Sequence, residues 1–114
     1  MSETSALVIG HITVKDEGKW AEYRSQVPAT LAPWGAELVF RGKRFEVFGG
    51  DHGHADTVVI RFPSVEAARG WFHSPAYQAL IPLRQQAAEV VLVGFEPQFH
   101  GLTGGGPGPA AHAV

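Results

Sequence analysis

Apolar and polar residues succeed each other along the chain with two alternating periods, about two and about 3.6 residues, which is typical of mixed strands and helices. The β-branched run at 6–14 predicts a first strand. Aromatic and aliphatic residues at helical spacings predict a helix over 15–34, with Pro28 bending its path and Pro33 near its end. The pattern therefore predicts a strand followed by a helix.

A hairpin is predicted next. Residues 36–41 and 44–48 alternate as strands do, and they flank Gly42-Lys43. Because a leading glycine suits a type II′ turn, these two residues are expected to form the hairpin loop. The polar stretch 49–56 then predicts a longer loop.

Two serines mark helix starts in the second half of the chain. Ser64 is a suitable N-cap, and Glu66 follows in the favourable first turn. Ser74 precedes Pro75, which lacks the N–H that the first turn of a helix leaves unused. The other expected elements are a strand at 57–62, a helical segment at 75–87 interrupted at Pro82, and a last strand at 89–95.

The order of these elements is that of the split βαβ, or ferredoxin-like, fold. It predicts an α+β domain with an antiparallel sheet and helices on one face. Residues 1–99 are expected to form this single domain. Residues 100–114 are rich in Gly, Pro and Ala and are expected to form a flexible tail.

Strand alternation divides the sheet residues into an apolar face, expected beneath the helices, and a mixed face. The mixed face is either washed by solvent or covered by the sheet of a second copy, which would enclose its charged residues. The apolar set is Val8, Ile12, Val14, Ala36, Leu38, Phe40, Val58, Ile60 and Phe62. The mixed set is Leu7, Ile9, His11, Thr13, Glu37, Val39, Arg41, Thr57, Val59 and Arg61.

Composition narrows the class of protein. With 114 residues, 45% hydrophobic content and no apolar run long enough for a bilayer, the chain is expected to be soluble and not a membrane protein. No secretion signal is evident, so a cytoplasmic location is expected. The absence of cysteine excludes thiolate chemistry. A net charge of −2 with scattered basic residues excludes nucleic acid as an expected partner.

Three stretches resemble the domain-of-unknown-function thirteen-thirty family and, through it, the dimeric α+β barrel superfamily. They are "VPATLAPWGAELVFRGKRFEVFGGD", "VVIRFPSVEAARGWFHSPAYQALIPLRQQAA" and "VVLVGF", within residues 6–96. The resemblance implies a ferredoxin-like protomer and a homodimer through the mixed sheet face. It implies no settled reaction, since relatives in the wider superfamily include cofactor-independent oxygenases and small isomerases.

Aromatic residues gather around the predicted helices. They either fill the core or line an apolar cleft between helices and sheet, where a flat aromatic ligand would lie and a tyrosine hydroxyl or His73 would orient it. These candidate pocket residues are Trp20, Tyr23, Trp34, Trp71, Phe72, His73 and Tyr77.

A second hypothesis places a reactive site on the mixed sheet face. His11 would act as a general base beside Arg41 and Arg61, which would stabilise an enolate or phenolate, with Glu37 as the orienting carboxylate. The alternative is a structural histidine in a dimer interface. The excess positive charge is expected to lower the pKa of His11.

Other candidates give weaker signals. Asp51, His52, His54 and Asp56 have the ligand types of a metal site, but a solvated loop is favoured because no further ligand is evident. No metal and no cofactor are therefore expected. Arg84 is expected to form a surface ion pair with Glu66 or Glu89.

Two functions stay open. One is an oxygenase- or isomerase-like enzyme that acts without a cofactor on a small, mostly apolar or aromatic carboxylate. The other is a dimer that binds a small molecule or a partner without turnover. A closed cavity of roughly 300 Å³ with a titratable side chain favours the enzyme, and a packed core favours the second function.

Overall fold

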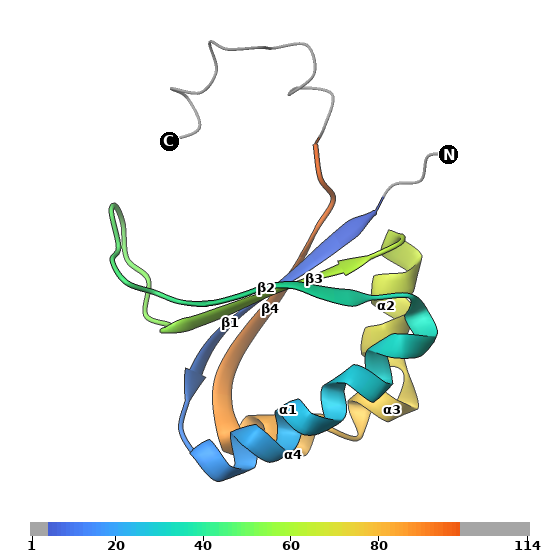
Figure 1. Cartoon of the computed structure of the whole chain (residues 1–114), viewed down its shortest axis with the longest axis horizontal. Helices are drawn as coiled ribbons and strands as arrows, with labels where there is room; N and C mark the ends of the chain where they lie inside the picture. Colours follow the sequence, from blue (N-terminus) through green and yellow to red (C-terminus); the bar gives the residue numbers. More distant parts are fainter. Residues whose placement is uncertain (1–4, 99–114) are drawn as a thin grey trace.

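A computed structural model describes residues 5–98. Four strands form one antiparallel sheet in the order β2-β3-β1-β4 (Figure 1). The predicted strands at 6–14, 57–62 and 89–95 are confirmed. The strands are β1 (Ala6–Val14), β2 (Glu37–Lys43), β3 (Asp56–Phe62) and β4 (Ala88–Phe95).

The helices cover one face of the sheet and leave the other face open (Figure 1). Side chains from α1, α2 and α3 meet Phe62 and the other buried strand residues in a single core. Trp71, Tyr77 and Phe62 are its largest fully buried members. The helices are α1 (Glu17–Leu31), the 3-10 helix η1 (Ala32–Trp34), α2 (Val65–His73), α3 (Pro75–Gln78) and α4 (Ile81–Ala87).

Side-chain caps begin three of these helices. Ser64 Oγ accepts a hydrogen bond from the Ala67 amide, and Ser74 Oγ accepts one from the Tyr77 amide, as the sequence predicted. Asp16 caps α1 in the same way and was not predicted. The break at Ser74 separates α2 from α3 and returns Tyr77 to the core beside Trp71.

The predicted hairpin at Gly42-Lys43 is wrong. Strand β2 continues through both residues, which pair with Thr57 and Asp56 of β3. A type II′ turn needs a positive φ at its leading glycine, and within the described chain only Gly35 and Gly50 have one. Residues 44–48 form no strand, so β2 and β3 are joined by a long connection over residues 44–55, which we call the arm.

A bulge in β2 reverses the predicted direction of two side chains. The β2–β3 register shifts between Leu38 and Phe40, so that Phe40 opposes Val59 and Arg41 opposes Val58. Because Val59 lies on the open face and Val58 on the helix face, Phe40 points to the open face and Arg41 to the helices. Strict alternation predicted the opposite, with Phe40 beneath the helices and Arg41 on the mixed face.

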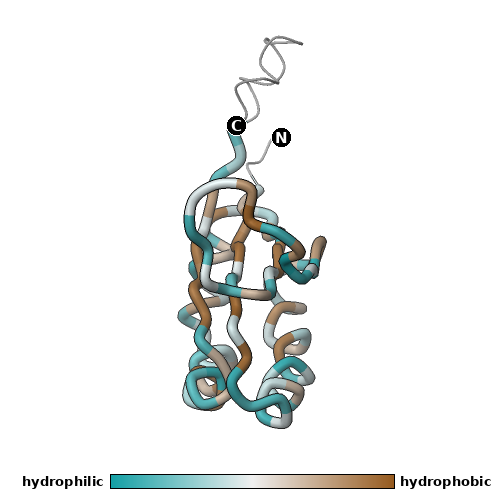
Figure 2. Tube along the Cα trace, turned by 90° about the vertical axis from the view of Figure 1, so that its left-hand side faces the viewer, coloured by the Kyte–Doolittle hydropathy of each residue, from teal (hydrophilic) through white to brown (hydrophobic). Residues whose placement is uncertain are grey.

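Each strand contains an apolar run flanked by polar residues or glycine, and Figure 2 shows such hydrophobic and hydrophilic stretches along the chain. Within residues 5–98, no helix is long and apolar enough to cross a membrane. The predicted tail at 100–114 lies outside the described residues.

Candidate functional site

A cleft lies between helix α1 and the helix face of the sheet. Its inner part has a volume of about 100 Å³ and a mostly apolar lining. Its outer part has a volume of about 370 Å³ and contains charged side chains. Neither part is a sealed cavity. The two parts adjoin, because they share the lining residues Ile12, Trp20, Arg24, Arg41 and Val58.

Helix α1 supplies one wall of the inner part. Apolar and aromatic residues recur every three or four positions along α1, so they share the helix face that packs against the sheet. They are Trp20, Tyr23, Val27 and Leu31. Trp20 stacks on Tyr23 with ring centroids 5.1 Å apart. Trp71 of α2 adds a third aromatic ring to this lining.

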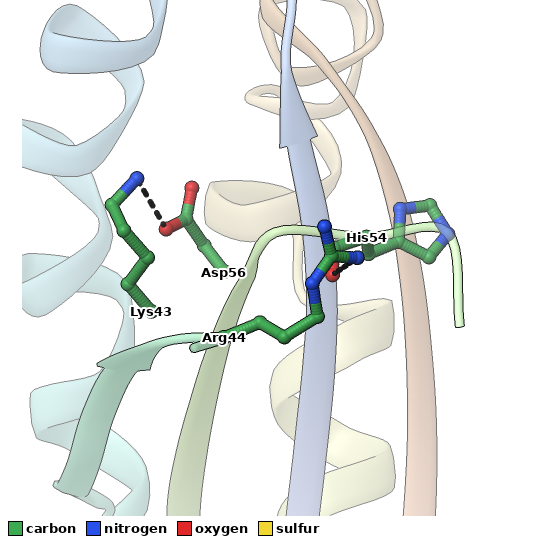
Figure 3. A network of polar contacts seen from close by, with 4 residues as sticks. All are labelled: Lys43, Arg44, His54 and Asp56. Atoms are coloured by element: carbon green, nitrogen blue, oxygen red, sulfur yellow. Dashed lines mark hydrogen bonds and ion pairs between the residues drawn. The ribbon is translucent and has the colours of Figure 1, made fainter. Parts of the chain in front are cut away.

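Two arginines lie at the junction of the inner and outer parts. Arg24 extends from α1, and Arg41 points to the helix face because of the β2 bulge. Burial, and next the charge of Arg24, lower the pKa of Arg41, whereas the carboxylate of Asp56 acts in the opposite direction. Asp56 itself pairs with Lys43 at 3.6 Å (Figure 3). Within residues 5–98, neither arginine forms an ion pair.

A buried pair of tyrosine hydroxyls lies behind the inner part. Tyr23 Oη and Tyr77 Oη are 2.7 Å apart, and Arg84 Nη1 donates a hydrogen bond to Tyr77 Oη at 2.9 Å. Burial, and next the contact with Tyr77, raise the pKa of Tyr23, so this hydroxyl stays protonated at neutral pH. The expected surface ion pair of Arg84 with Glu66 or Glu89 is wrong, because Arg84 turns inward to Tyr77.

The seven predicted pocket residues separate into three groups. Trp20, Tyr23 and Trp71 line the inner cleft, and Tyr77 is fully buried behind it. Trp34 packs over Gly70, where a Cβ atom would lie 2.4 Å from the indole ring. The remaining two residues, Phe72 and His73, line another surface pocket of about 280 Å³ beside α2, which shares Trp71 and Leu92 with the inner part of the cleft.

The four residues of the predicted sheet-face site do not come together. Arg41 lies on the helix face, whereas Glu37 and Arg61 form an exposed ion pair on the open face. His11 opposes Thr57, four residues along β1 from the Leu7–Arg61 pair, which is about 13 Å at 3.3 Å per residue.

The environment of His11 differs from the one expected. Its Nδ1 lies 3.1 Å from Thr57 Oγ1, and its ring meets that of His52 edge-on at 4.8 Å. The pKa of His11 is lowered by burial and next by the neighbouring His52 and His54. The two arginines named in the hypothesis are not the cause. In the stretch from residue 5 to 98, no group of three or more His, Cys, Asp or Glu is arranged to hold a metal ion.

Sequence reasoning missed Arg24 as a site residue. Its signal was available, because Arg24 follows Trp20 by four residues and therefore lies on the same face of α1. An arginine on an otherwise apolar helix face is a feature that a cleft accommodates and a packed core does not.

A family model described as a domain of unknown function, DUF1330, matches residues 5–96. The chain belongs to the DUF1330 family. The resemblance given by the sequence is thereby confirmed. No curated protein matches this DUF1330 chain.

Solved structures share the fold of this DUF1330 protein at low sequence identity. RPA0582, a protein of unknown function from Rhodopseudomonas palustris, is 17% identical, with 85% of each chain covered and a TM-score of 0.72. SnoaB, a cofactor-independent oxygenase from Streptomyces nogalater, is 12% identical, with 83% of this chain and 94% of SnoaB covered and a TM-score of 0.60. A dimeric ferredoxin-like protein of unknown function from Thermobifida fusca is 14% identical, with coverages of 85% and 94% and a TM-score of 0.60. These similarities show the ferredoxin-like α+β fold and no specific activity.

Proposed function

We propose that this protein binds a small, mostly apolar or aromatic carboxylate in the cleft between α1 and the sheet. The observation that carries the proposal is the pair of arginines, Arg24 and Arg41, at the junction of an apolar cavity and a polar opening. The carboxylate would lie between the two guanidinium groups, and the apolar body of the ligand would enter the inner cavity.

The charge balance of the cleft supports an anionic ligand. Two neighbouring guanidinium groups repel each other. Both residues are exposed, and partial burial of the Arg41 guanidinium group removes some of the water that screens its charge. The outer part is lined by three cations, Arg24, Arg41 and Lys43, and by two carboxylates, Glu17 and Asp56, so one positive charge is left over. Asp56 pairs with Lys43 and does not neutralise both arginines. A carboxylate accepts two parallel hydrogen bonds from a guanidinium group and supplies the missing negative charge.

Turnover without a cofactor would use the hydroxyl of Tyr23. Tyr23 lines the inner cavity, and its hydroxyl stays protonated at neutral pH. A ligand that reached this hydroxyl would receive a hydrogen bond at an oxygen atom that gains negative charge during a reaction. The fold shared with SnoaB shows that such a scaffold accommodates chemistry without a cofactor in another protein. The alternative is binding without turnover.

We also propose that the protein is a homodimer through the open sheet face. One apolar residue from each of the four strands contributes to a single row across the open face, which we call the apolar band. Its members, in strand order, are Phe40, Val59, Ile9 and Val93. Phe40 is 53% exposed and Val93 39% exposed in the single chain. A contiguous apolar band of this kind is typical of an interface, and the Thermobifida fusca neighbour is described as dimeric.

Ligand titration tests the binding proposal. We expect benzoate to raise the melting temperature and to shift NMR signals of the inner cleft, whereas benzamide, its uncharged counterpart, should have little effect. Arg41→Met keeps the apolar stem and removes the charge, so it should weaken benzoate binding at least about tenfold. Arg24→Met should also weaken benzoate binding.

Arg61→Met is the matched control, because Arg61 lies on the opposite face of the same sheet. It should leave benzoate binding unchanged. If Arg61→Met abolished binding and Arg41→Met did not, the cleft proposal would fail and the sheet-face site would replace it. Mass spectrometry of incubated aromatic carboxylates then separates the two functions, since binding without a new product supports the non-catalytic alternative.

A further inference from the structure

The arm carries two of the most exposed aromatic side chains of the described chain. Phe45 is 85% exposed and Phe48 is 83% exposed, and their rings meet edge-on at 5.8 Å. The arm projects beyond the ends of β2 and β3, away from the helix layer (Figure 1). Among residues 5–98, none covers this aromatic pair, and exposing two phenylalanines to water is unfavourable.

Polar contacts hold the base of the arm on the open side of the sheet. The ring of His52 lies against His11 of β1, and His54 Nδ1 is 2.8 Å from Thr13 Oγ1. Arg44 Nη1 donates to the carbonyl oxygens of His52 and His54, at 2.8 and 3.3 Å, and so joins the two limbs of the arm. Figure 3 shows its contact with His54. His11 and Thr13 both point to the open face, so the arm is anchored there.

The aromatic pair and the open face belong to one side of the molecule. Besides the apolar band, the open face exposes Val91 at 46% and Phe95 at 49% on β4. Seen from the end at which it projects, the arm shows hydrophobic stretches like those of the strands (Figure 2). The arm therefore extends the apolar surface of the open face beyond the edge of the sheet.

We infer that the arm clasps a second copy of this chain, with Phe45 and Phe48 packed on the partner protomer. This inference rests on the proposed homodimer and adds a contact outside the two stacked sheets. In a two-fold dimer each protomer contributes one arm, so the aromatic contact occurs twice. The arm is held in place before association, which lowers the entropy cost of ordering it.

A second copy fits this surface better than the end of the same chain. Residues 99–114 hold only three large apolar residues, Phe99, Leu102 and Val114, among glycine, proline and alanine. A second copy brings a complete open face together with its own arm. It therefore offers more apolar side chains to cover the aromatic pair than residues 99–114 do.

Sedimentation velocity over about 0.1–100 µM tests the inference through the dimer dissociation constant. The double variant Phe45→Ser/Phe48→Ser should weaken the dimer at least about tenfold, because buried aromatic residues dominate binding at interfaces. Glu46→Ser, on the same arm, is the matched control and should leave the dissociation constant within about twofold. The full-length variant Phe99→Ser/Leu102→Ser should also be unchanged.

The outcomes separate this inference from the dimer proposal. Ile9→Asp in the apolar band should give a monomer, because it places an unpaired charge between the stacked sheets. A wild-type protein that stays monomeric would overturn both the dimer and the clasp. A wild-type dimer that loses no affinity in Phe45→Ser/Phe48→Ser would overturn the clasp alone. Weakening only in Phe99→Ser/Leu102→Ser would show that the end of the chain, and not the aromatic pair, contributes to the dimer, and would also overturn the clasp.

Discussion

The tyrosine pair behind the cleft gives a quantitative test of the structure. Tyr77 is fully buried, and its hydroxyl contacts both Tyr23 Oη at 2.7 Å and Arg84 Nη1 at 2.9 Å. Tyr77→Phe removes one oxygen atom and leaves both partners without it. Because one partner is charged and the other is a buried hydroxyl, we expect the free energy of unfolding to fall by about 1.5–3 kcal/mol.

Tyr23→Phe is the matched single-atom deletion and should cost less, about 0.5–1.5 kcal/mol, because Tyr77 keeps its hydrogen bond from Arg84. The double variant should be no less stable than Tyr77→Phe alone. Once the Tyr77 hydroxyl is absent, the Tyr23 hydroxyl is buried without that partner, and removing it costs nothing further.

Urea unfolding measures these three values, and all variants are compared at one protein concentration because dimerisation would make the apparent stability depend on concentration. Equal slopes against urea would show that the same surface unfolds in each variant. Additivity of the two single effects within about 0.3–0.5 kcal/mol would refute a shared hydrogen-bond network.

Two further predictions concern the same core. The pKa of Tyr23 is raised above its usual 10.0 in the folded protein. The contribution of this hydroxyl to stability should therefore be complete below pH 10 and decline as pH rises further, because only the unfolded chain then releases the proton. The free energy of unfolding, measured as a function of alkaline pH, should decline less steeply in Tyr23→Phe. Trp71 is 2% exposed and donates a hydrogen bond to Thr30 Oγ1, so Trp71→Ala should lower the free energy of unfolding by about 3–5 kcal/mol. A loss below about 0.5 kcal/mol would identify Trp71 as a replaceable part of the cleft wall instead of core.

Local signals predicted most of the elements. Ser64 and Ser74 begin helices because their hydroxyls satisfy amides three residues later, a requirement that depends on the chain nearby and on nothing else. The strand at 57–62 and the last strand likewise follow from their β-branched runs. These features could be read from the sequence because the interactions that cause them span few residues.

The hairpin failed because a glycine has more than one use. Gly42 suggested a turn, yet it lies in an extended strand under the ring of Phe40, whose Cζ atom would be 2.5 Å from a Cβ at that position. The close approach of an aromatic ring, rather than a positive φ, explains the residue. Only the pairing with β3, more than a dozen residues away, distinguishes the two explanations.

The sheet-face site failed for a related reason. The hypothesis grouped His11, Arg41 and Arg61 by strict alternation, and alternation holds only while the strand is regular. The register shift between Leu38 and Phe40 moves Arg41 to the other face. The residues around Val39 carry no signal for a bulge, because the bulge is caused by the pairing of β2 with β3 and not by a local preference of the chain.

The bulge also links the two proposals made for this protein. Without it, Phe40 would point into the helix layer and Arg41 would lie in the open face, where an unpaired guanidinium group opposes close stacking of two sheets. With it, Phe40 joins Ile9 in the apolar band, and Arg41 meets Arg24 at the opening of the cleft. One extra residue in an edge strand thus removes a charge from the face proposed to dimerise and supplies that charge to the site proposed to bind a carboxylate.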